Sequence, residues 1–345
     1  MRSMTYVGLD VHKKTIAYCI KSGAGKLIEQ GEINAHRREL GQLAARLKKP
    51  WCAALEATLF TGWIYDFLKP RATELKVAHP AMLKAISASK KKNDRVDAEK
   101  IADLLRVGLL PECYMASAQI RQQRRVLRYR NLVLSEATRM KNKIAGLLME
   151  CGAPYVKDKL HGKAYFGERL SGLDEQTPES VRELLRLSRS NLELFDGLQQ
   201  GLVKKLAKSE ALSARLERLT RIEGVGQILG LTWMLEVGDP QRFGSIRQAV
   251  SYCGLCSAQD SSAGVDKRGP ISKQRNKHLQ HVLIEAAKLA PRYNEQLAAV
   301  HQRELARGNK NRATLAVARK LVAYLLAADR SEQPFEPRAV AATVP

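Results

Sequence analysis

The first hundred residues alternate between short apolar segments and amphipathic ones. The spacing of the apolar residues predicts strands where it alternates and helices where it follows the helical period. The turn sequence SGAG (22–25) separates two of the strands. The predicted strands are residues 5–11, 15–21, 26–34, 51–57 and 75–80, and the predicted helices between them are 37–49 and 59–69. A hairpin followed by alternating helices and strands predicts an α/β domain with a mixed sheet and helices on its faces.

Helical periodicity dominates the middle of the chain. Residues 116–151 contain no proline and one glycine, and a glycine-rich stretch that is predicted to be a loop follows at 161–178. A second helix then carries an apolar stripe of Phe195, Leu198, Leu202 and Leu206. Two long helices around a loop predict an antiparallel coiled-coil arm, and two ordinary core helices are the alternative.

The last third predicts an all-α domain. Residues 221–239, RIEGVGQILGLTWMLEVGD, have the helix–Gly-x-Gly–helix form of a helix-hairpin-helix, in which backbone N–H groups approach a phosphate. A tight turn between two helices has the same pattern. Helical segments at 247–255 and 271–290 flank a loop punctuated by glycine. The predicted domains are 1–115, 116–215 and 216–330, with a flexible tail at 331–345.

The net charge of the chain indicates what kind of partner it binds. The 345 residues are 45% apolar and carry a formal net charge of +23. Such an excess favours a polyanion, because Lys and Arg release condensed counterions when they bind phosphates. An acidic membrane surface is the competing polyanion, but no apolar run reaches the roughly 18 residues that a bilayer span requires. A strand is predicted at once, without a signal peptide, so we expect a cytoplasmic, nucleoid-associated protein with no membrane partner.

Four carboxylates occupy unusual positions. Asp10 lies near the end of the first predicted strand among apolar neighbours, and Glu56 ends the strand at 51–57. Burying a carboxylate is unfavourable unless it is paired or metal-bound, so two acids at strand ends favour a shared cation. Asp94 and Asp97 lie in the run KKKNDRVDAEKIADLL (90–105), three residues apart at the start of a predicted helix. This spacing makes both side chains project to one side.

These acids predict a divalent-metal site and leave an ordinary explanation open. Carboxylate oxygens are the ligands that Mg²⁺ or Mn²⁺ prefers, and two ions about 3.5–4 Å apart would clamp an in-line phosphoryl displacement. Alternatively, Asp10 caps a turn, Glu56 is an edge-strand surface residue, and Asp94 and Asp97 are the N-cap and a first-turn acid of the helix.

Five sequence blocks, in order along nearly the whole chain, carry a family resemblance. They are GLDVHK (8–13), LEAT (55–58), NDRVDAEKIA (93–102), CGL (253–255) with DSSAG (260–264), and ISKQRN (271–276). Together they resemble the DEDD transposases, which are the recombinases of the insertion-sequence family IS110, and the Piv DNA invertases. The resemblance implies an N-terminal RuvC-like (RNase H-like) domain, a helical coiled-coil arm and a C-terminal transposase domain.

The resemblance also assigns roles to single residues. The catalytic, metal-binding acids of the family match Asp10, Glu56, Asp94 and Asp97. Its serine nucleophile matches Ser262, with the adjacent Ser261 as the alternative nucleophile. Glu99 and Asp103 have no counterpart in the family pattern, and Glu99 is expected at the surface.

Near the serine the sequence departs from the family pattern. Ser257 stands where the family has proline, and Arg275 stands where it has glycine. Both departures leave the geometry of the serine loop open.

The implied function is a DNA transposase or site-specific recombinase that cleaves and rejoins DNA with a serine nucleophile and Mg²⁺ or Mn²⁺. The implied partners are donor and target DNA, a structured guide (bridge) RNA from the element, and further copies of the chain in a dimer or tetramer. Base pairing would then read the DNA sequence, and the protein would bind the backbone. Two alternatives remain: a RuvC-like structure-specific nuclease that uses water as nucleophile, and a non-catalytic nucleic-acid-binding protein.

Basic residues beside the acids and the serine, and along the long helix, are candidates for phosphate contacts, with a generic basic surface as the alternative. The candidate nucleic-acid-binding residues are Lys90, Lys91, Lys92, Arg121, Arg125, Arg128, Lys267, Arg268, Lys273, Arg275 and Lys277.

Overall fold

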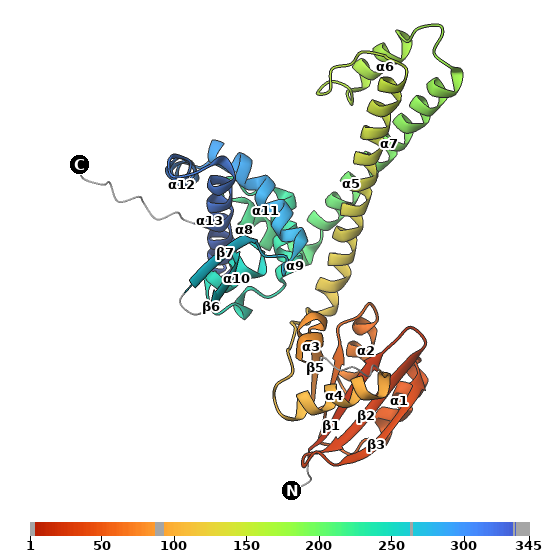
Figure 1. The fold of residues 1–345 in the computed structure, drawn as a ribbon, viewed down its shortest axis with the longest axis vertical. Helices are drawn as coiled ribbons and strands as arrows, with labels where there is room; N and C mark the ends of the chain where they lie inside the picture. Colours follow the sequence, from red (N-terminus) through yellow and green to blue (C-terminus); the bar gives the residue numbers. More distant parts are fainter. Residues whose placement is uncertain (1–3, 87–92, 263–264, 334, 336–345) are drawn as a thin grey trace, which may run out of the picture. The chain divides into compact units, whose positions relative to one another are not determined.

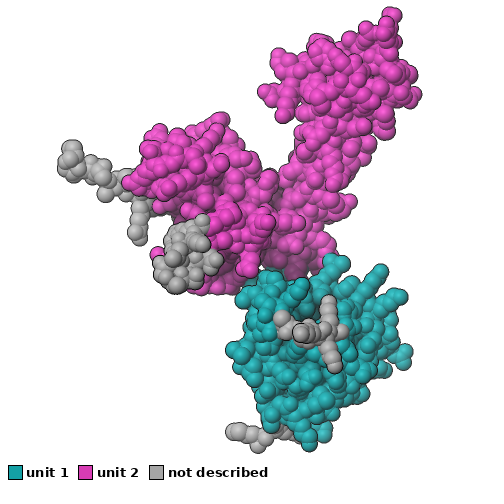
Figure 2. Space-filling view, viewed as in Figure 1, with its two compact units in different colours: residues 1–118 teal, residues 119–345 magenta. Residues whose placement is uncertain are grey.

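The computed structural model describes residues 4–86, 93–262, 265–333 and 335. Contacts within the chain divide it into two compact units, residues 1–118 and 119–345 (Figure 2). The further division of the second unit into an arm and a transposase domain stays a prediction.

A five-stranded sheet forms the first unit (Figure 1). Its strands are β1 (Thr5–Val11), β2 (Thr15–Ser22), β3 (Leu27–Asn34), β4 (Trp51–Glu56) and β5 (Glu74–Ala78). The spatial order is β3-β2-β1-β4-β5, with β1, β2 and β3 antiparallel and β1, β4 and β5 parallel. The helices are α1 (Arg37–Arg46), α2 (Thr61–Leu68), α3 (Pro80–Ile86) and α4 (Asp94–Arg106). The predicted mixed sheet with helices is therefore confirmed.

Helices cover both faces of this sheet because alternate residues of each strand are apolar on opposite sides. Val7 and Leu9 pack with residues of α1 and α2, such as Leu40 and Ile64. On the other face the residues of β1, β2 and β4 are small, and α4 packs closely against them. Gly8 allows the closest approach, since a Cβ atom built there would lie 2.0 Å from the carbonyl oxygen of Ala98.

Gly8→Ala is expected to lower the free energy of unfolding of the first unit by about 2 kcal/mol, because the new methyl group must push α4 away from the sheet. Urea denaturation measures the change. Gly41→Ala in α1 is the matched control, since its Cβ would meet only the ring of Phe67 at 3.4 Å and the substitution favours helix. Equal stability of both variants would contradict the close contact.

The second unit is mainly helical. Its helices are α5 (Ala118–Glu150), α6 (Lys163–Ser171), α7 (Glu179–Ala207), α8 (Glu210–Thr220), α9 (Gln227–Val237), α10 (Ile246–Tyr252), α11 (Lys277–Leu289), α12 (Glu295–Ala306) and α13 (Lys310–Ser331), with the short 3₁₀ helices η1 (Pro240–Arg242) and η2 (Ala290–Arg292). Among the described residues, no helix has the length and apolar character that crossing a bilayer requires.

Helices α6 and α7 differ from the prediction in two details. Residues 161–178 were predicted as loop, but α6 lies within them, and Phe166 of α6 is buried in the core that α5 and α7 share. The predicted apolar stripe of α7 is partly wrong, because Leu198 is 48% exposed, whereas Leu192 and Val203 are buried. The buried face of α7 changes along the helix. Leu192 packs in the core shared with α5 and α6, whereas Val203 packs in the core formed with α8 and α9.

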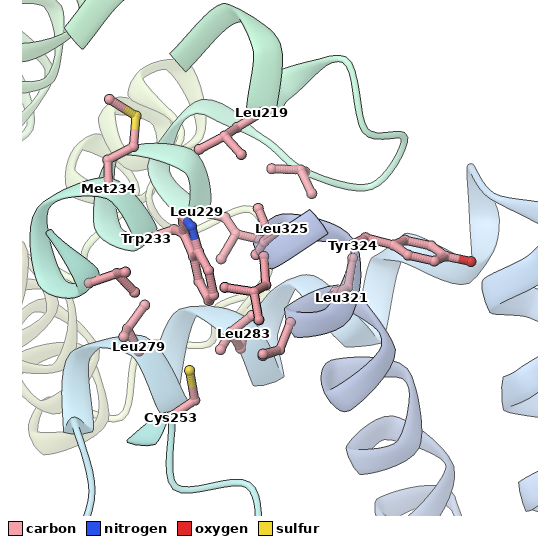
Figure 3. Packing of buried hydrophobic residues seen from close by; sticks show 14 of the residues in the cluster. Leu219, Leu229, Trp233, Met234, Cys253, Leu279, Leu283, Leu321, Tyr324 and Leu325 are labelled. Carbon is pink, nitrogen blue, oxygen red and sulfur yellow. The ribbon is translucent and has the colours of Figure 1, made fainter. Parts of the chain in front are cut away.

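A single apolar core joins α8, α9, α11 and α13 (Figure 3). Trp233 lies at its centre, and its Nε1 donates a hydrogen bond of 2.9 Å to the buried Asp329. Arg215 forms two further bonds to that carboxylate, at 2.7 and 2.6 Å. This pairing satisfies a buried charge that would otherwise be unfavourable.

The prediction of an all-α C-terminal domain with a loop after residue 255 is wrong at one place. Strands β6 (Ser257–Ser262) and β7 (Val265–Ile271) form an antiparallel hairpin. Glycine and proline within this segment suggested a loop, but pairing between the strands satisfies their backbone groups. The long helix predicted at 271–290 begins only at Lys277, because the Asn276 side chain caps it by accepting hydrogen bonds from two backbone amides.

Candidate metal-ion centre and serine hairpin

Strand pairing brings Asp10 and Glu56 to neighbouring strand ends. Leu9 of β1 is paired with Leu55 of the parallel strand β4, so the next residues, Asp10 and Glu56, lie side by side on the α4 face. Asp10 is buried, at 8% exposure, and Glu56 is half-buried. The Glu56 backbone is fixed by Thr61, whose hydroxyl donates a hydrogen bond of 3.2 Å to the Glu56 carbonyl oxygen.

Helix α4 contributes the other two predicted acids from its first turn. Asn93 is the N-cap, and its side chain accepts a hydrogen bond from the Arg95 amide. The alternative in which Asp94 was the N-cap is therefore wrong. Asp94 and Asp97 are both first-turn residues, where the helix dipole favours negative charge. Asp97 lies 3.4 Å from the ammonium group of Lys100.

The structure brings Asp10 and Asp94 together around a third side chain. Nε2 of His12 lies 3.2 Å from Oδ2 of Asp10 and 3.4 Å from Oδ1 of Asp94. Within the described part of the chain, these three residues form the one group whose donor atoms all lie within 4.8 Å of one another. Glu56 and Asp97 lie outside this group.

The surroundings of Asp10 shift the pKa of its carboxyl group. Burial raises its pKa, the charge and hydrogen bond of His12 lower it, and the nearby charges of Asp94 and Asp97 raise it again. The net result is a pKa above the usual value for aspartate. A bound cation would remove this penalty, because it stabilises the ionised carboxylate.

The donor set fits a divalent cation. Two carboxylates and an imidazole converge from different elements, and carboxylates are the preferred ligands of Mg²⁺ and Mn²⁺. Sequence reasoning did not single out His12. The signal available in the sequence was its position two residues after Asp10, which places both side chains on one face of an extended chain.

Glu99 is exposed over 42% of its side chain, as expected of a surface residue, and it also pairs with a buried lysine. Nζ of the buried Lys21 lies 2.8 Å from Glu99 and 2.6 Å from Asp103. Burial lowers the pKa of Lys21, but its bonds to the two carboxylates outweigh this effect and hold the pKa above its usual value. The pair therefore fixes α4 to β2, next to the candidate metal centre.

The predicted serine lies at the end of the β6–β7 hairpin. In the strand register Ser261 is opposite Asp266, and Ser262 is opposite Val265. The side chains of both serines lie outside what the structure describes, so the choice between them stays a prediction. At the base of the hairpin, the Ser272 amide donates a hydrogen bond of 3.0 Å to the Cys256 carbonyl.

A buried carboxylate joins this hairpin region to α5. Glu236 is 1% exposed and accepts two hydrogen bonds of 2.8 Å from Arg128 of α5. It also accepts a bond of 2.9 Å from the side chain of Asn276, which caps α11. Tyr252, just before the hairpin, donates a bond of 2.9 Å to the Glu236 carbonyl. Arg128 thus has a structural partner, and its predicted contact with nucleic acid stays a prediction.

Gly224 of the predicted helix-hairpin-helix has a packing reason. Its φ is +90°, and a Cβ atom there would lie 2.7 Å from the Cβ of Ala290. Gly226, in contrast, has open space around it and borders a groove of about 1100 Å³ between α5, α9 and α11. The tight-turn explanation thus accounts for Gly224, and phosphate binding at this turn stays a prediction.

The structure describes six of the eleven candidate phosphate-binding side chains. Lys90, Lys91 and Lys92 lie outside the described residues, as do the side chains of Lys267 and Arg268. The exposed ones are Arg125, Arg128, Lys273, Arg275 and Lys277, and Arg121 is half-buried. These exposed side chains are accessible to nucleic acid, and their contacts with it stay predictions.

Comparison with known proteins gives two family matches. Residues 7–152 match the model of the IS110-type DEDD transposases, described as "Transposase", and residues 216–302 match the model described as "Transposase IS116/IS110/IS902 family". The chain is 26% identical over 300 residues to the transposase for insertion sequence element IS1111A of Coxiella burnetii, covering 85% of this chain and 79% of that protein. It is 24% identical over 332 residues to the transposase for insertion sequence element IS1328 of Yersinia enterocolitica, covering 93% and 95%.

Proposed function

The chain belongs to the IS110 family of DEDD transposases, and on that premise we propose that this DNA transposase cleaves and rejoins DNA with a serine nucleophile assisted by a divalent-metal site. The observation that carries the proposal is the convergence of Asp10, near the C-terminal end of the central strand β1, with Asp94, at the start of α4, in a chain that matches both family models. The strand order β3-β2-β1-β4-β5 supports a RuvC-like domain.

In this proposal Asp10, Glu56, Asp94 and Asp97 hold the metal ion. Their carboxylates come from two adjacent strand ends and one helix start, which gives the site a rigid frame. Bound Mg²⁺ or Mn²⁺ supplies charge stabilisation at the scissile phosphate. Asp10 is buried and its pKa is raised, so the positive charge of an ion would favour its ionised form.

Ser262 is the proposed nucleophile. Its hydroxyl oxygen attacks the phosphorus, a phosphoserine ester forms, and one DNA strand end leaves as a free hydroxyl. The ester retains the energy of the phosphodiester, so the hydroxyl of another strand can displace the serine and rejoin DNA. Serine is a weak nucleophile by itself and needs activation. The position of Ser262 at a hairpin end supports this role, because such an end can present it to DNA.

The proposed partners are donor and target DNA and an element-encoded guide (bridge) RNA. The net charge of +23 supports the binding of two polyanions, DNA and RNA. We further propose that a dimer or tetramer completes the reaction, with the metal site of one copy serving the serine of another, and that the protein is associated with the bacterial nucleoid. These proposals rest on the family resemblance together with the charge.

A covalent adduct tests the proposed chemistry. Full-length protein is incubated with Mn²⁺, donor DNA that carries the element ends, and RNA transcribed from the non-coding end. Denaturation, nuclease digestion and peptide mass spectrometry should locate a nucleotide on Ser262. The adduct should disappear in Ser262→Ala and persist in Ser261→Ala.

The other outcomes separate the alternatives. An adduct on Ser261 would reassign the nucleophile. DNA cleavage without any adduct would instead support a nuclease in which water attacks, because the water reaction leaves no protein–DNA bond. Binding of DNA and RNA without cleavage under any metal would support the non-catalytic alternative.

A further inference from the structure

His12 stands in the candidate metal centre by virtue of strand geometry. Asp10 and His12 are two residues apart at the end of β1, so both side chains point to the face that α4 covers. The His12 amide donates a hydrogen bond of 2.9 Å to the Thr15 carbonyl, which closes the β1–β2 turn and fixes the backbone of His12. The imidazole is therefore held beside the carboxylates by the turn.

A hydrogen bond alone explains the position of this imidazole poorly. Nε2 carries at most one proton, yet it faces Asp10 at 3.2 Å and Asp94 at 3.4 Å. Only the contact with Asp10 has hydrogen-bond geometry. One N–H cannot serve both carboxylates well, whereas a cation at the centre would attract all three donor atoms.

Two of the three separations between donor atoms are close to those in a coordination sphere. Neighbouring ligands of an octahedral ion with bonds of about 2.1 Å lie about 3 Å apart. The separations of 3.2 and 3.4 Å between Nε2 and the two carboxylate oxygens are close to such octahedral edges. A small movement of half-exposed side chains would complete them, since both His12 and Asp94 are 51% exposed.

We infer that His12 is a nitrogen ligand of the divalent ion, alongside Asp10 and Asp94, and that it makes the site favour Mn²⁺ over Mg²⁺. Mg²⁺ strongly prefers oxygen ligands, whereas first-row transition ions accept imidazole. The inference rests on the proposed metal site and adds a ligand outside its four acids. It explains why a histidine rather than a further acid faces Asp10.

Pulsed electron paramagnetic resonance of the Mn²⁺-loaded full-length protein tests this ligand directly. The spectrum should show coupling from a coordinated nitrogen, which His12→Ser should remove and His36→Ser should leave unchanged. His36 is the matched control because it is exposed and lies before α1, outside the group of donor atoms. Calorimetric titration should show Mn²⁺ affinity falling at least tenfold in His12→Ser, with a smaller change for Mg²⁺.

The outcomes separate this inference from the proposed function. Nitrogen coupling that survives in His12→Ser, or an unchanged ratio of Mn²⁺ to Mg²⁺ affinity, overturns the role of His12. If wild-type protein binds neither ion, or if Asp94→Asn binds both as wild type does, the metal site itself fails. Circular dichroism checks folding, and His12→Gln, which retains a polar side chain of similar length, should also lose the coupling.

Discussion

Asp10→Asn is expected to abolish DNA cleavage while leaving the first unit at least as stable as in the wild type. Loss of a group that holds transition-state charge reduces the rate on the order of a thousandfold. The free energy of unfolding should rise in this variant, because burial and the nearby Asp94 charge raise the pKa of Asp10. An ionised Asp10 therefore opposes folding at neutral pH, and asparagine removes that effect, with an expected gain of about 1 kcal/mol.

The sign of the pH dependence follows from the raised pKa. Protonation of Asp10 favours the folded state below the usual aspartate pKa of 3.8, and this benefit is lost as the pH rises through the folded pKa. The advantage of Asp10→Asn should therefore be present at pH 7 and disappear in acid. Hydrogen exchange of β1 and β4 across a urea series, in a chelator, measures it.

Asp66→Asn is a suitable control for Asp10→Asn, since Asp66 lies in α2 on the opposite face of the sheet. It should retain cleavage. A cleavage-competent Asp10→Asn would refute the catalytic assignment, whereas an inactive but strongly destabilised one would show that Asp10 holds the fold.

Arg128→Met is expected to lower the free energy of unfolding of the second unit by about 3 kcal/mol, because it leaves Glu236 buried without its main partner. This loss is at the low end of the range for removing one partner of a buried ion pair, because the Asn276 side chain still donates a hydrogen bond to Glu236. Hydrogen exchange of α5 and α9 across a urea series measures it. Arg125→Met is the control, because Arg125 lies on the same helix but is not among the residues that interact with Glu236.

The effect of Arg128→Met should depend on pH. Burial raises the pKa of Glu236, but bonds from Arg128 and Asn276 and the charge of Arg124 outweigh it and hold the pKa below its usual value. The stability that the ion pair contributes is therefore full above the usual glutamate pKa of 4.5 and is lost as the pH falls through the folded pKa. Destabilisation by Arg128→Met that does not shrink in acid would contradict this pairing.

A double variant separates the structural role of Arg128 from its predicted contact with nucleic acid. Arg128→Met with Glu236→Gln removes both charges, so it should recover most of the lost stability. If Arg128 also binds a phosphate, the double variant will still bind duplex DNA more weakly, with a salt dependence reduced by about one contact. Wild-type affinity and salt dependence would leave Arg128 with the structural role alone.

Local sequence patterns were sufficient for most elements of both units. Alternation at 5–11 and 15–21 predicted β1 and β2, and the absence of proline predicted α5. The hairpin β6–β7 was missed because its apolar spacing is weak and its glycines resemble loop signals. Pairing between strands, which spacing within one strand does not reveal, decides such a segment.

The candidate site shows the same division. The sequence by itself determined that Asp10, Glu56, Asp94 and Asp97 stand at strand ends and a helix start, because those positions follow from local periodicity, and its blocks determined the family. Only the tertiary structure decided that His12 joins Asp10 and Asp94, that Lys21 holds Glu99, and that Arg128 pairs with Glu236. The contacts of His12 with Asp94, of Lys21 with Glu99 and of Arg128 with Glu236 join residues far apart in the chain, and their distances depend on strand register and on how closely α4 or α5 packs.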